Sequence, residues 1–480
     1  MERITIHPDD NVSVALTDIE AEQGKIARGH KLALKDIKNG ANIIKYGFPI
    51  GSATADIKKG EWVHTHNMRT NLSEDAQYSY EPRLTPLESE PPQSFSGYLR
   101  EDGSAGVRNE LWIIPTVGCV NGIAQKAAQD NKDLVQGPID GLYAFPHPFG
   151  CSQMGGDHEQ TKKLLASLVR HPNAGAVLVL SLGCENNTID QFKQAIGTWD
   201  DSRVKFLVCQ DVDDELEQCR VLLSQLADYA SGFKREPIPV SKLVIGMKCG
   251  GSDGLSGITA NPTVGRFSDI LISQGGSTIL TEVPEMFGAE MMLMERCIDR
   301  DVYESTVKMV EDFKDYFKRH GQVVYENPSP GNKQGGISTL EDKSCGCVQK
   351  GGSAPVVDVI GYGDRVRRQG LTLLSGPGND LVSATVLTAA GAQIILFTTG
   401  RGTPFGAPAP TVKISSNNDL ADRKKGWMDF NAGPVADGEP LDKAGRRLMD
   451  YVISVACGEK TKSEENGYRE ISIFKGGVVL

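Results

Sequence analysis

Four cysteines stand at equivalent places in the chain, each directly after a short apolar run. Cys119 follows LWIIPTVG, Cys151 follows LYAFPHPFG, Cys184 follows AVLVLSLG and Cys249 follows LVIGMK. If these runs are parallel strands, their carboxyl ends share one edge of a sheet, and we expect the four thiols to gather there. Thiolates so arranged suit iron, zinc or an iron–sulfur cluster. The alternative is four small buried apolar side chains, because no CxxC pair is present.

The remaining cysteines give a weaker signal. Cys345 and Cys347 lie in the short segment SCGCVQ, which we interpret as a Gly-rich loop without a metal. The carboxylates of TEVPE, Glu282 and Glu285, follow another apolar run and are candidate hard ligands or acid–base groups. The other cysteines resemble core or helix-face residues: Cys209, Cys219, Cys297 and Cys457.

Three of the eight histidines lie in two segments of the first 72 residues, GHK and VHTHN. In an extended segment His64 and His66 point to the same face, so both imidazoles can meet one ligand. Imidazole titrates near neutral pH, which makes His30, His64 and His66 candidate general acids or bases. The alternative is solvated histidines at an exposed strand end.

Glycine-rich turns occur at 250–257, 328–336 and 398–404. Backbone N–H groups in such turns can bind an oxyanion, and Lys333 and Arg401 would add charge for a carboxylate. Asn332 and Asp253 lie in the same turns and are further candidates for substrate binding. Gly-rich segments also serve simply as turns, so this interpretation stays open.

The elements that would position these residues change character along the chain. Residues 1–72 show short alternating stretches typical of a small β module, and 73–96 have the polar, proline-rich composition of a linker. From 97 onward, short apolar runs alternate with helical patterns, which predicts an α/β fold with a mostly parallel sheet covered on both faces. We place a boundary at 236, giving a middle domain at 97–236 and a larger domain at 237–480.

Composition excludes several functional classes. With 62 acidic and 51 basic residues the formal charge is −11, which argues against nucleic acid or an anionic membrane as partner. The N-terminus lacks an apolar signal region and no apolar run reaches membrane-spanning length, so we expect a cytoplasmic protein. Neither a G-x-G-x-x-G after a strand nor a P-loop is present, which argues against dinucleotides and nucleoside triphosphates.

Long motifs of the chain resemble one family. GHKLALKDI, ANIIKYGFPIG and VHTHN are similar to the β-clip (SAF-type) module of the altronate and galactarate dehydratases. GCENN, CGGSDGLSGITANP, TEVPEMFGAE, ENPSPGNKQGG and TTGRGTP are similar to that family's catalytic portion. The resemblance implies a β-clip domain, a linker, a dimerising middle domain and a Rossmann-like C-terminal domain without nucleotide. It also implies a homodimer that depends on Fe²⁺, or on Mn²⁺, under reducing conditions.

The resemblance further implies that the chain removes water from D-altronate to give 2-dehydro-3-deoxy-D-gluconate. We expect Cys151, Cys184 and Cys249 to hold the iron, with Cys119 as a fourth ligand. His64 or His66 would act as base or acid, and the cations of the Gly-rich turns would bind the carboxylate. The alternatives are galactarate or another sugar acid as substrate, a lyase that eliminates another group, and a non-catalytic carbohydrate-binding protein.

Overall fold

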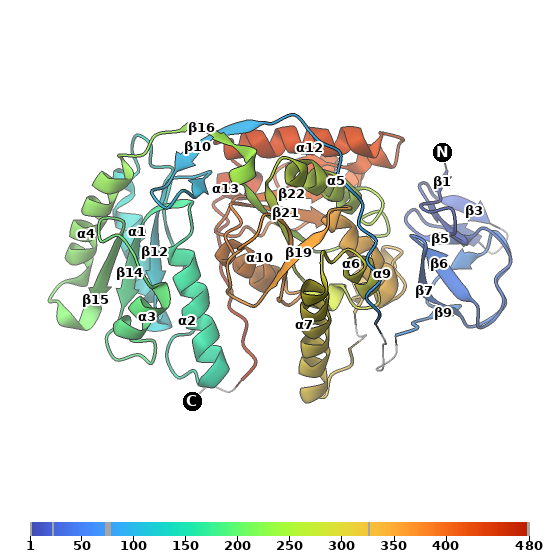
Figure 1. The fold of residues 1–480 in the computed structure, drawn as a ribbon, viewed down its shortest axis with the longest axis horizontal. Coiled ribbons are helices and arrows are strands. Elements are labelled where there is room, and N and C mark those ends of the chain that lie inside the picture. Colours follow the sequence, from blue (N-terminus) through green and yellow to red (C-terminus); the bar gives the residue numbers. More distant parts are fainter. Residues whose placement is uncertain (1, 22–23, 73–77, 325–326, 478–480) are drawn as a thin grey trace.

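The computed structural model describes residues 2–21, 24–72, 78–324 and 327–477. The chain runs from a small N-terminal module, past the C-terminal domain, to a middle domain at the opposite end, and then returns to build the C-terminal domain (Figure 1). The described C-terminal segment lies against the middle domain, where Gly476 N donates to the Asp157 carboxylate at 2.9 Å.

The N-terminal module consists of short antiparallel strands. One sheet has the order β1-β2-β5-β8, a second has the order β6-β7-β9, and β3 pairs with β4. Their bounds are β1 Arg3–Ile4, β2 Val12–Ala15, β3 Ile19–Ala21, β4 Gly24–Ile26, β5 Lys31–Ala33, β6 Asn42–Lys45, β7 Phe48–Ala53, β8 Trp62–Val63 and β9 Met68–Arg69. Side chains such as Val12, Ile43 and Val63 fill the space between the sheets and are fully buried.

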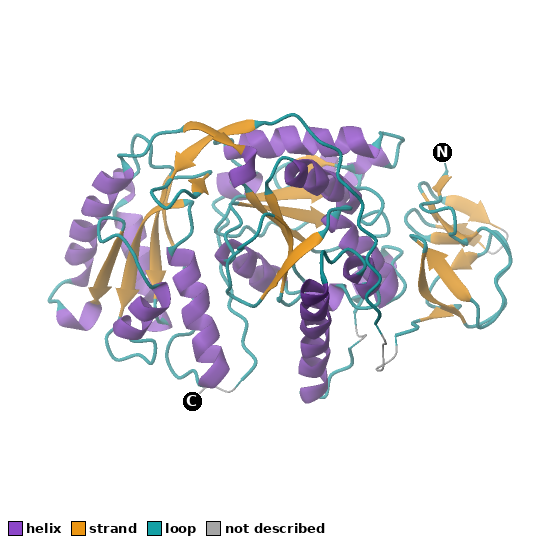
Figure 2. Ribbon diagram, viewed as in Figure 1, coloured by secondary structure: helices purple, strands orange, loops and turns teal. Residues whose placement is uncertain are grey.

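The middle domain is a parallel sheet of order β13-β12-β14-β15 with helices on both faces (Figure 2). Along β12, Trp112 and Ile114 face α2 and α3, whereas Leu111 and Ile113 face α1 and α4. This alternation is the period of two expected of a strand buried on both faces. The elements are β12 Glu110–Pro115, α1 Asn121–Asp130, β13 Gly141–Ala144, α2 Gly155–Val169, β14 Ala174–Ser181, α3 Ile189–Ile196, β15 Val204–Val208 and α4 Glu215–Ala230.

A small sheet links the middle and C-terminal domains. Its strand order is β11-β10-β16, and both pairings are antiparallel. Its bounds are β10 Ser94–Leu99, β11 Ala105–Gly106 and β16 Glu236–Pro239. Strand β10 thus begins inside the predicted linker.

The C-terminal domain is built on a parallel sheet of order β19-β20-β18-β17-β21-β22-β23. On β21, Ile394 and Leu396 join the core under α5 and α12, whereas Ile395 and Phe397 join a core shared with the middle domain. The strands are β17 Val244–Cys249, β18 Ser277–Leu280, β19 Val356–Ile360, β20 Gly370–Leu374, β21 Ile394–Thr399, β22 Thr411–Ser415 and β23 Phe430–Asn431. The helices are α5 Ala260–Ser273, α6 Glu290–Met294, α7 Arg300–Arg319, α8 Pro330–Gln334, α9 Leu340–Cys347, α10 Asp380–Ala389, α11 Asn418–Arg423, α12 Leu441–Ala456 and α13 Lys462–Glu465.

The N-terminal module docks firmly on the C-terminal domain. The ammonium groups of Lys31 and Lys45 reach the Asp342 carboxylate at the start of α9, at 2.7 and 3.0 Å, and all three side chains are buried. Gly29 lies so close to the backbone of Gly335 that an added Cβ would stand 3.1 Å from its oxygen. Buried ion pairs therefore hold the module against the C-terminal domain.

The segment between the module and the middle domain also packs on the C-terminal domain. The hydroxyl of Tyr78 lies 2.6 Å from Nζ of Lys314 on α7, and the Glu90 carboxylate pairs with Arg446 of α12 at 2.7 Å. Residues 73–77 of the predicted linker lie outside the described residues.

The predicted fold class is confirmed, since the apolar runs form the parallel strands β12, β13, β14, β15, β17, β18 and β21. One local prediction is wrong: the segment from His64 to Asn67 is a turn, not an extended strand, because the His64 carbonyl accepts from Asn67 N at 3.0 Å. Among the described residues, no helix is both long and apolar enough to cross a membrane.

Candidate active site

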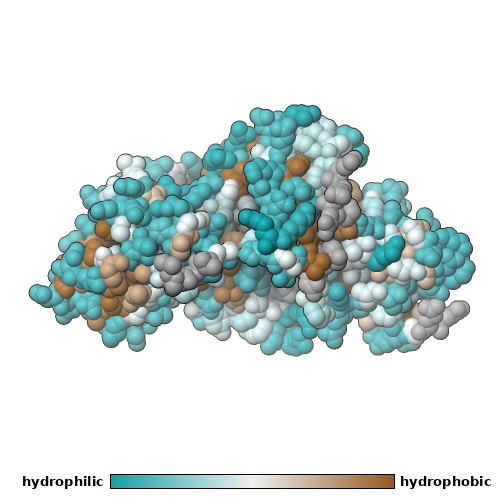
Figure 3. All heavy atoms as spheres, turned by 90° about the horizontal axis from the view of Figure 1, so that it is seen from below, coloured by the Kyte–Doolittle hydropathy of each residue, from teal (hydrophilic) through white to brown (hydrophobic). Residues whose placement is uncertain are grey.

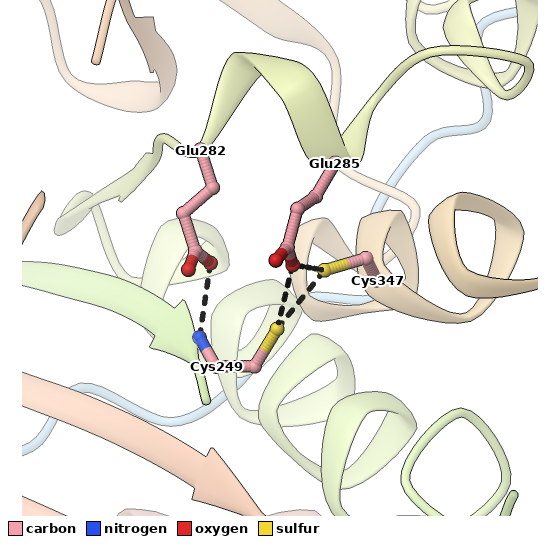
Figure 4. Close-up of side chains that lie close together, drawn as sticks. All are labelled: Cys249, Glu282, Glu285 and Cys347. Atoms are coloured by element: carbon pink, nitrogen blue, oxygen red, sulfur yellow. Dashed lines mark hydrogen bonds between the residues drawn. The ribbon is translucent and has the colours of Figure 1, made fainter. Parts of the chain in front are cut away.

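A buried cluster of two sulfurs and two carboxylates lies at the carboxyl edge of the seven-stranded sheet (Figure 4). Cys249 ends β17, Glu282 and Glu285 follow β18, and Cys347 ends α9. The Cys249 sulfur lies 3.0 Å from the Cys347 sulfur and 3.2 Å from a Glu285 oxygen, and Cys347 lies 2.9 Å from the same oxygen. One ligand atom from each residue lies within 4.8 Å of the others. Two soft and two hard donors thus face a common centre, and we call this set the cage.

Three buried lysines balance the charge of the cage. Nζ of Lys350 lies 3.0 Å from each sulfur and 3.2 Å from Glu282. Lys248 pairs with Glu282 at 3.1 Å, and Lys343 pairs with Glu285 at 2.8 Å. The negative charge of the cage is therefore neutralised by ammonium groups in a site shielded from water.

Neighbouring charges and burial fix the protonation states of the groups in the cage. Burial disfavours the charged carboxylate, but Lys343 and Lys350 prevail and lower the pKa of Glu285 to about 2. The hydrogen bond to Cys249, together with burial, raises the pKa of the Cys347 thiol far above its ordinary value. Burial opposes the charge of Lys350, yet the two nearby sulfurs raise its pKa well above normal. One sulfur therefore keeps a proton while the ammonium stays charged.

Backbone strain positions one carboxylate of the cage. Glu282 has φ +69° and ψ +54°, the left-handed region that non-glycine residues seldom occupy. In this conformation its carboxylate accepts from the backbone N of Cys249 at 2.9 Å. Strained residues of this kind concentrate at functional sites, because the surrounding contacts must enforce them.

Cys347 was predicted to lie in a Gly-rich loop without a metal, and the prediction of a loop is wrong. Residues 340–347 form α9, whose first turn is capped by the side chain of Thr339. The helix carries Cys347 to the cage, whereas Cys345 lies in the apolar core. The N-cap threonine followed by Glu341 and Asp342 was the sequence signal that could have predicted this helix.

The other predicted thiol ligands lie in a different domain. Cys119, Cys151 and Cys184 follow β12, β13 and β14 of the middle sheet, whereas Cys249 ends β17 of the C-terminal sheet. The expectation that all four gather at one edge is therefore wrong, because the strands belong to two sheets. The three loops carrying the middle-domain thiols are hydrogen-bonded to one another, for example from Gly118 N to the Phe149 carbonyl at 2.9 Å. In the described part of the chain these thiols do not form a compact group with other ligands comparable to the cage.

The predicted histidines lie where the N-terminal module meets the C-terminal domain. Nδ1 of His30 accepts from the indole of Trp62 at 3.1 Å, so its Nε2 carries the proton and faces the Gln334 carbonyl at 3.3 Å. Nδ1 of His64 lies 2.9 Å from the hydroxyl of Ser338. His64 stacks on Trp62 with the ring centroids 5.4 Å apart, and the exposed His66 lies 4.9 Å from the same ring.

Burial keeps the two inner imidazoles neutral. It lowers the pKa of His64 to about 4, with Lys31 adding to the effect, and it also lowers the pKa of His30. Both nitrogens of His30 are engaged, so it orients its neighbours. His64 is better suited to take up a proton.

The Gly-rich turns converge on the same interface. Asn332 forms a capping box with Ser329 at the start of α8, and its amide donates to the Ser252 carbonyl at 2.8 Å. The Asp253 carboxylate accepts from the hydroxyls of Ser256 and Ser416 and from the Asn417 amide. These two candidates therefore shape the turns with their polar atoms.

Lys333 and Arg401 are the exposed cations of these turns. Nη1 of Arg401 donates to the Gly331 carbonyl of α8 at 2.9 Å, which brings the third turn to the second. Lys333 lies on α8 and Arg401 contacts it, and the carboxyl end of the same helix contacts His30.

A narrow pocket connects the docked module with the cage. Its wall includes Lys45 and Tyr46 from the N-terminal module and Asp253, Lys343 and Cys347 from the C-terminal domain. Lys343 and Cys347 are also part of the cage region, so a ligand here would contact both domains. The site thus combines acid–base groups, ammonium groups and soft ligands.

Three family models together match most of the chain. The "Altronate/galactarate dehydratase SAF domain" matches residues 1–71, the "D-galactarate dehydratase/Altronate hydrolase, second domain" matches 97–231, and the "D-galactarate/Altronate dehydratase, C-terminal" model matches 240–479.

Curated relatives agree with these matches. The chain is 53% identical to an altronate dehydratase of Bacillus subtilis, over 99% of both chains. It is 51% identical to an altronate dehydratase of Escherichia coli over the full length of both. It is 32% identical to the L-threo-forming galactarate dehydratase of Escherichia coli, over 98% of this chain and 96% of that one.

Proposed function

This chain belongs to the altronate and galactarate dehydratase family, and from that premise we propose that it is an altronate dehydratase, a hydro-lyase. It would convert D-altronate into 2-dehydro-3-deoxy-D-gluconate and water in hexuronate catabolism. The greater similarity to altronate dehydratases than to a galactarate dehydratase supports this substrate. The geometric observation that carries an elimination is the neutral His64 on the module docked beside the cage.

In this reaction His64 takes the proton from C2 of the substrate. An imidazole whose pKa is lowered to about 4 is unprotonated at neutral pH and can accept it. Departure of the C3 hydroxyl as water requires a second proton, and we propose that the exposed His66 or a lysine of the pocket supplies it. The water therefore carries the C3 oxygen and the proton from this acid, while the C2 proton stays on His64 until solvent removes it. The enol then tautomerises to the 2-keto acid by losing the proton of its C2 hydroxyl and gaining one at C3, so the net loss is one water.

The substrate carboxylate requires positive charge. We propose that Lys333 and Arg401, at the mouth of the Gly-rich turns, bind it, with Lys343 deeper in the pocket. This local charge lets an acidic protein bind an anion.

We further propose that the cage holds Fe²⁺, with Mn²⁺ as the alternative. The donor chemistry fits, because Cys249 and Cys347 offer soft sulfurs while Glu282 and Glu285 offer hard oxygens. The Lys350 ammonium, which contacts both sulfurs, marks the place of a cation and would move aside on binding. When bound, the ion supplies Lewis-acid polarisation of the substrate's carboxylate and hydroxyl oxygens.

The middle-domain thiols Cys119, Cys151 and Cys184 are the alternative iron site, in the form of an iron–sulfur cluster. Their loops are bonded to one another, which would hold three ligands at fixed spacing. A cluster would absorb visible light, whereas a lone ferrous ion in the cage would not give that strong colour.

We propose a cytoplasmic homodimer that pairs through the middle domain. Brown, apolar surface gathers at the end of the molecule where that domain lies (Figure 3). Apolar surface of this kind commonly marks a contact between subunits. Gel filtration with light scattering would measure the mass against the 51.8 kDa of one chain.

The first test is 2-keto-3-deoxy acid formation by protein purified without oxygen, assayed with D-altronate, D-galactarate and a panel of other sugar acids. Iron-dependent product from altronate supports the proposal. Product from galactarate alone would assign the chain to the alternative substrate. Sugar-acid binding without turnover, in protein that contains iron, would favour a carbohydrate-binding role.

A further inference from the structure

A second pocket lies between the middle and C-terminal domains, away from the docked N-terminal module. Its volume is about 340 Å³, and four arginines line it: Arg100, Arg170, Arg203 and Arg365. Arg365 follows β19 in the C-terminal domain. Arg100 directly follows β10 of the linking sheet, and Arg170 and Arg203 belong to the middle domain. The size lies within the range of small-molecule sites.

Backbone carbonyls hold the guanidinium groups without neutralising them. Arg100 donates to the carbonyls of Pro172 and Arg108 at 2.8 and 2.9 Å. Arg203 donates to three carbonyls around the end of α2, at 2.9 to 3.0 Å. Arg365 donates to the Arg170 carbonyl at 2.9 Å. Among the described residues, no carboxylate oxygen lies within 4.0 Å of any of the four guanidinium groups.

One buried guanidinium nitrogen of the pocket has no hydrogen-bond partner among the described residues. Nε of Arg170 is buried and makes no hydrogen bond in the described structure. A buried donor without an acceptor is costly, and so are several positive charges brought together out of water. Burial lowers the pKa of Arg100 to about 10, and the positive charge of Arg203 adds to that effect. The lowered pKa reflects the cost of bringing positive charges together out of water.

The acidic residues of the pocket do not remove the need for an anion. Asp102 accepts from Ser104 N and from its hydroxyl, at 2.9 and 2.6 Å, and Asp200 accepts from Ser202 N at 2.8 Å, so each binds its own turn. Glu101, also in the wall, is exposed. Aromatic side chains complete the lining and offer apolar surface to a carbon skeleton: Trp199, Tyr229 and Phe233.

We propose that this pocket binds a small organic dianion, a phosphate ester or a dicarboxylate, which joins the middle and C-terminal domains. The planar guanidinium fork matches both groups, and the unpartnered Arg170 Nε is a free donor for either. The ligand would hold the middle and C-terminal domains together and would not take part in the dehydration.

The test is calorimetric titration of the full-length protein with inorganic phosphate and, separately, with succinate, against potassium chloride at equal ionic strength. Thermal unfolding under the same conditions gives a second readout. Arg170→Gln and Arg365→Gln remove charge while leaving the carbonyl contacts of Arg100 and Arg203, and Arg423→Gln on the exposed surface of α11 is the charge-matched control.

We expect one of the two anions to bind and to raise the unfolding temperature beyond the effect of chloride. Each pocket variant should weaken that affinity about tenfold, the effect of one charge-assisted hydrogen bond, while the control retains it. Tighter binding of phosphate identifies a phosphate ester as the ligand class, and tighter binding of succinate identifies a dicarboxylate. Stabilisation equal to that by chloride, or unchanged affinity in both pocket variants, would overturn the proposal.

Discussion

The sulfur atoms of Cys249 and Cys347 lie 3.0 Å apart although 98 positions separate the two residues in the sequence. One ends a strand and the other ends a helix, so the contact depends on how α9 packs over the sheet edge. The Lys350 ammonium contacts both sulfurs, which makes the pair a centre of buried charge.

Replacing Cys347 by serine should abolish both iron binding and turnover. The substitution removes one of two soft donors from the cage, and serine is a poor ligand for ferrous iron at neutral pH. Metal analysis of protein reconstituted without oxygen, together with the keto-acid assay, measures both effects. Cys345→Ala is the matched control, because Cys345 lies on the same helix but in the apolar core.

The same assay distinguishes the two iron sites. We expect Cys184→Ser, in the middle domain, to retain its iron. Loss of iron and of visible absorbance in Cys184→Ser, with normal iron in Cys347→Ser, would assign the metal to a cluster on the middle-domain thiols instead.

His64→Ala should lower kcat by about 10²- to 10⁴-fold, the usual contribution of a general base. Its imidazole is buried at the interface and bonded to Ser338, whereas His66 is exposed, so His66→Ala should lose less. Steady-state kinetics on altronate measure both, with His7→Ala in the same module as the control. An equal loss in both variants would contradict the assignment of the base to His64.

The pattern of apolar runs predicted the parallel strands because each strand is buried on both faces and needs a continuous apolar sequence. The structure brings His30 and Arg401, which the sequence offered as separate candidates, to the same helix α8. The predicted boundary at 236 had put Cys249 outside the middle domain, yet the four cysteines were assigned to one sheet edge because β12 and β17 have the same sequence character. For this reason Cys249 was grouped with thiols of another domain.

The helix α9, which carries Cys347 to the cage, was not predicted for a different reason. Gly346 between two cysteines suggested a loop, yet the N-cap at Thr339 and the packing of Cys345 in the core sustain the helix. Tertiary contacts thus outweighed a local preference of about 1 kcal/mol against glycine.

Asp342→Asn should release the N-terminal module from the C-terminal domain. The carboxylate neutralises the buried ammonium groups of Lys31 and Lys45, and removing one partner of such a buried set typically costs about 3 to 5 kcal/mol. Limited proteolysis should then separate the module from the rest of the chain, and turnover should fall with it. Asp56→Asn, which breaks the exposed pair with Lys38, should leave the proteolysis pattern unchanged. An intact, active Asp342→Asn protein would show that the other contacts of the interface, such as the hydrogen bond from the Thr339 hydroxyl to the Ile50 carbonyl, are enough to hold the module.

Stability should decrease as the pH falls from 7 to 5, in part because of His171. This residue is fully buried, and burial lowers its pKa from 6.5 to about 3. Below pH 6.5 the unfolded chain binds a proton that the native state does not take up, so acid favours unfolding until the pH approaches 3. At pH 5 the difference amounts to about 2 kcal/mol for this group.

Denaturant unfolding at pH 7 and pH 5 tests this effect. His171→Gln, whose amide can still donate to the Ala392 carbonyl, does not titrate and should show a smaller difference between the two pH values than the wild type. His320→Gln, on the exposed end of α7, should behave as the wild type does. Because His171 lies in the middle domain, its effect is separate from the module interface. An equal pH dependence in wild type and His171→Gln would mean that other groups, such as the buried His147, account for the loss.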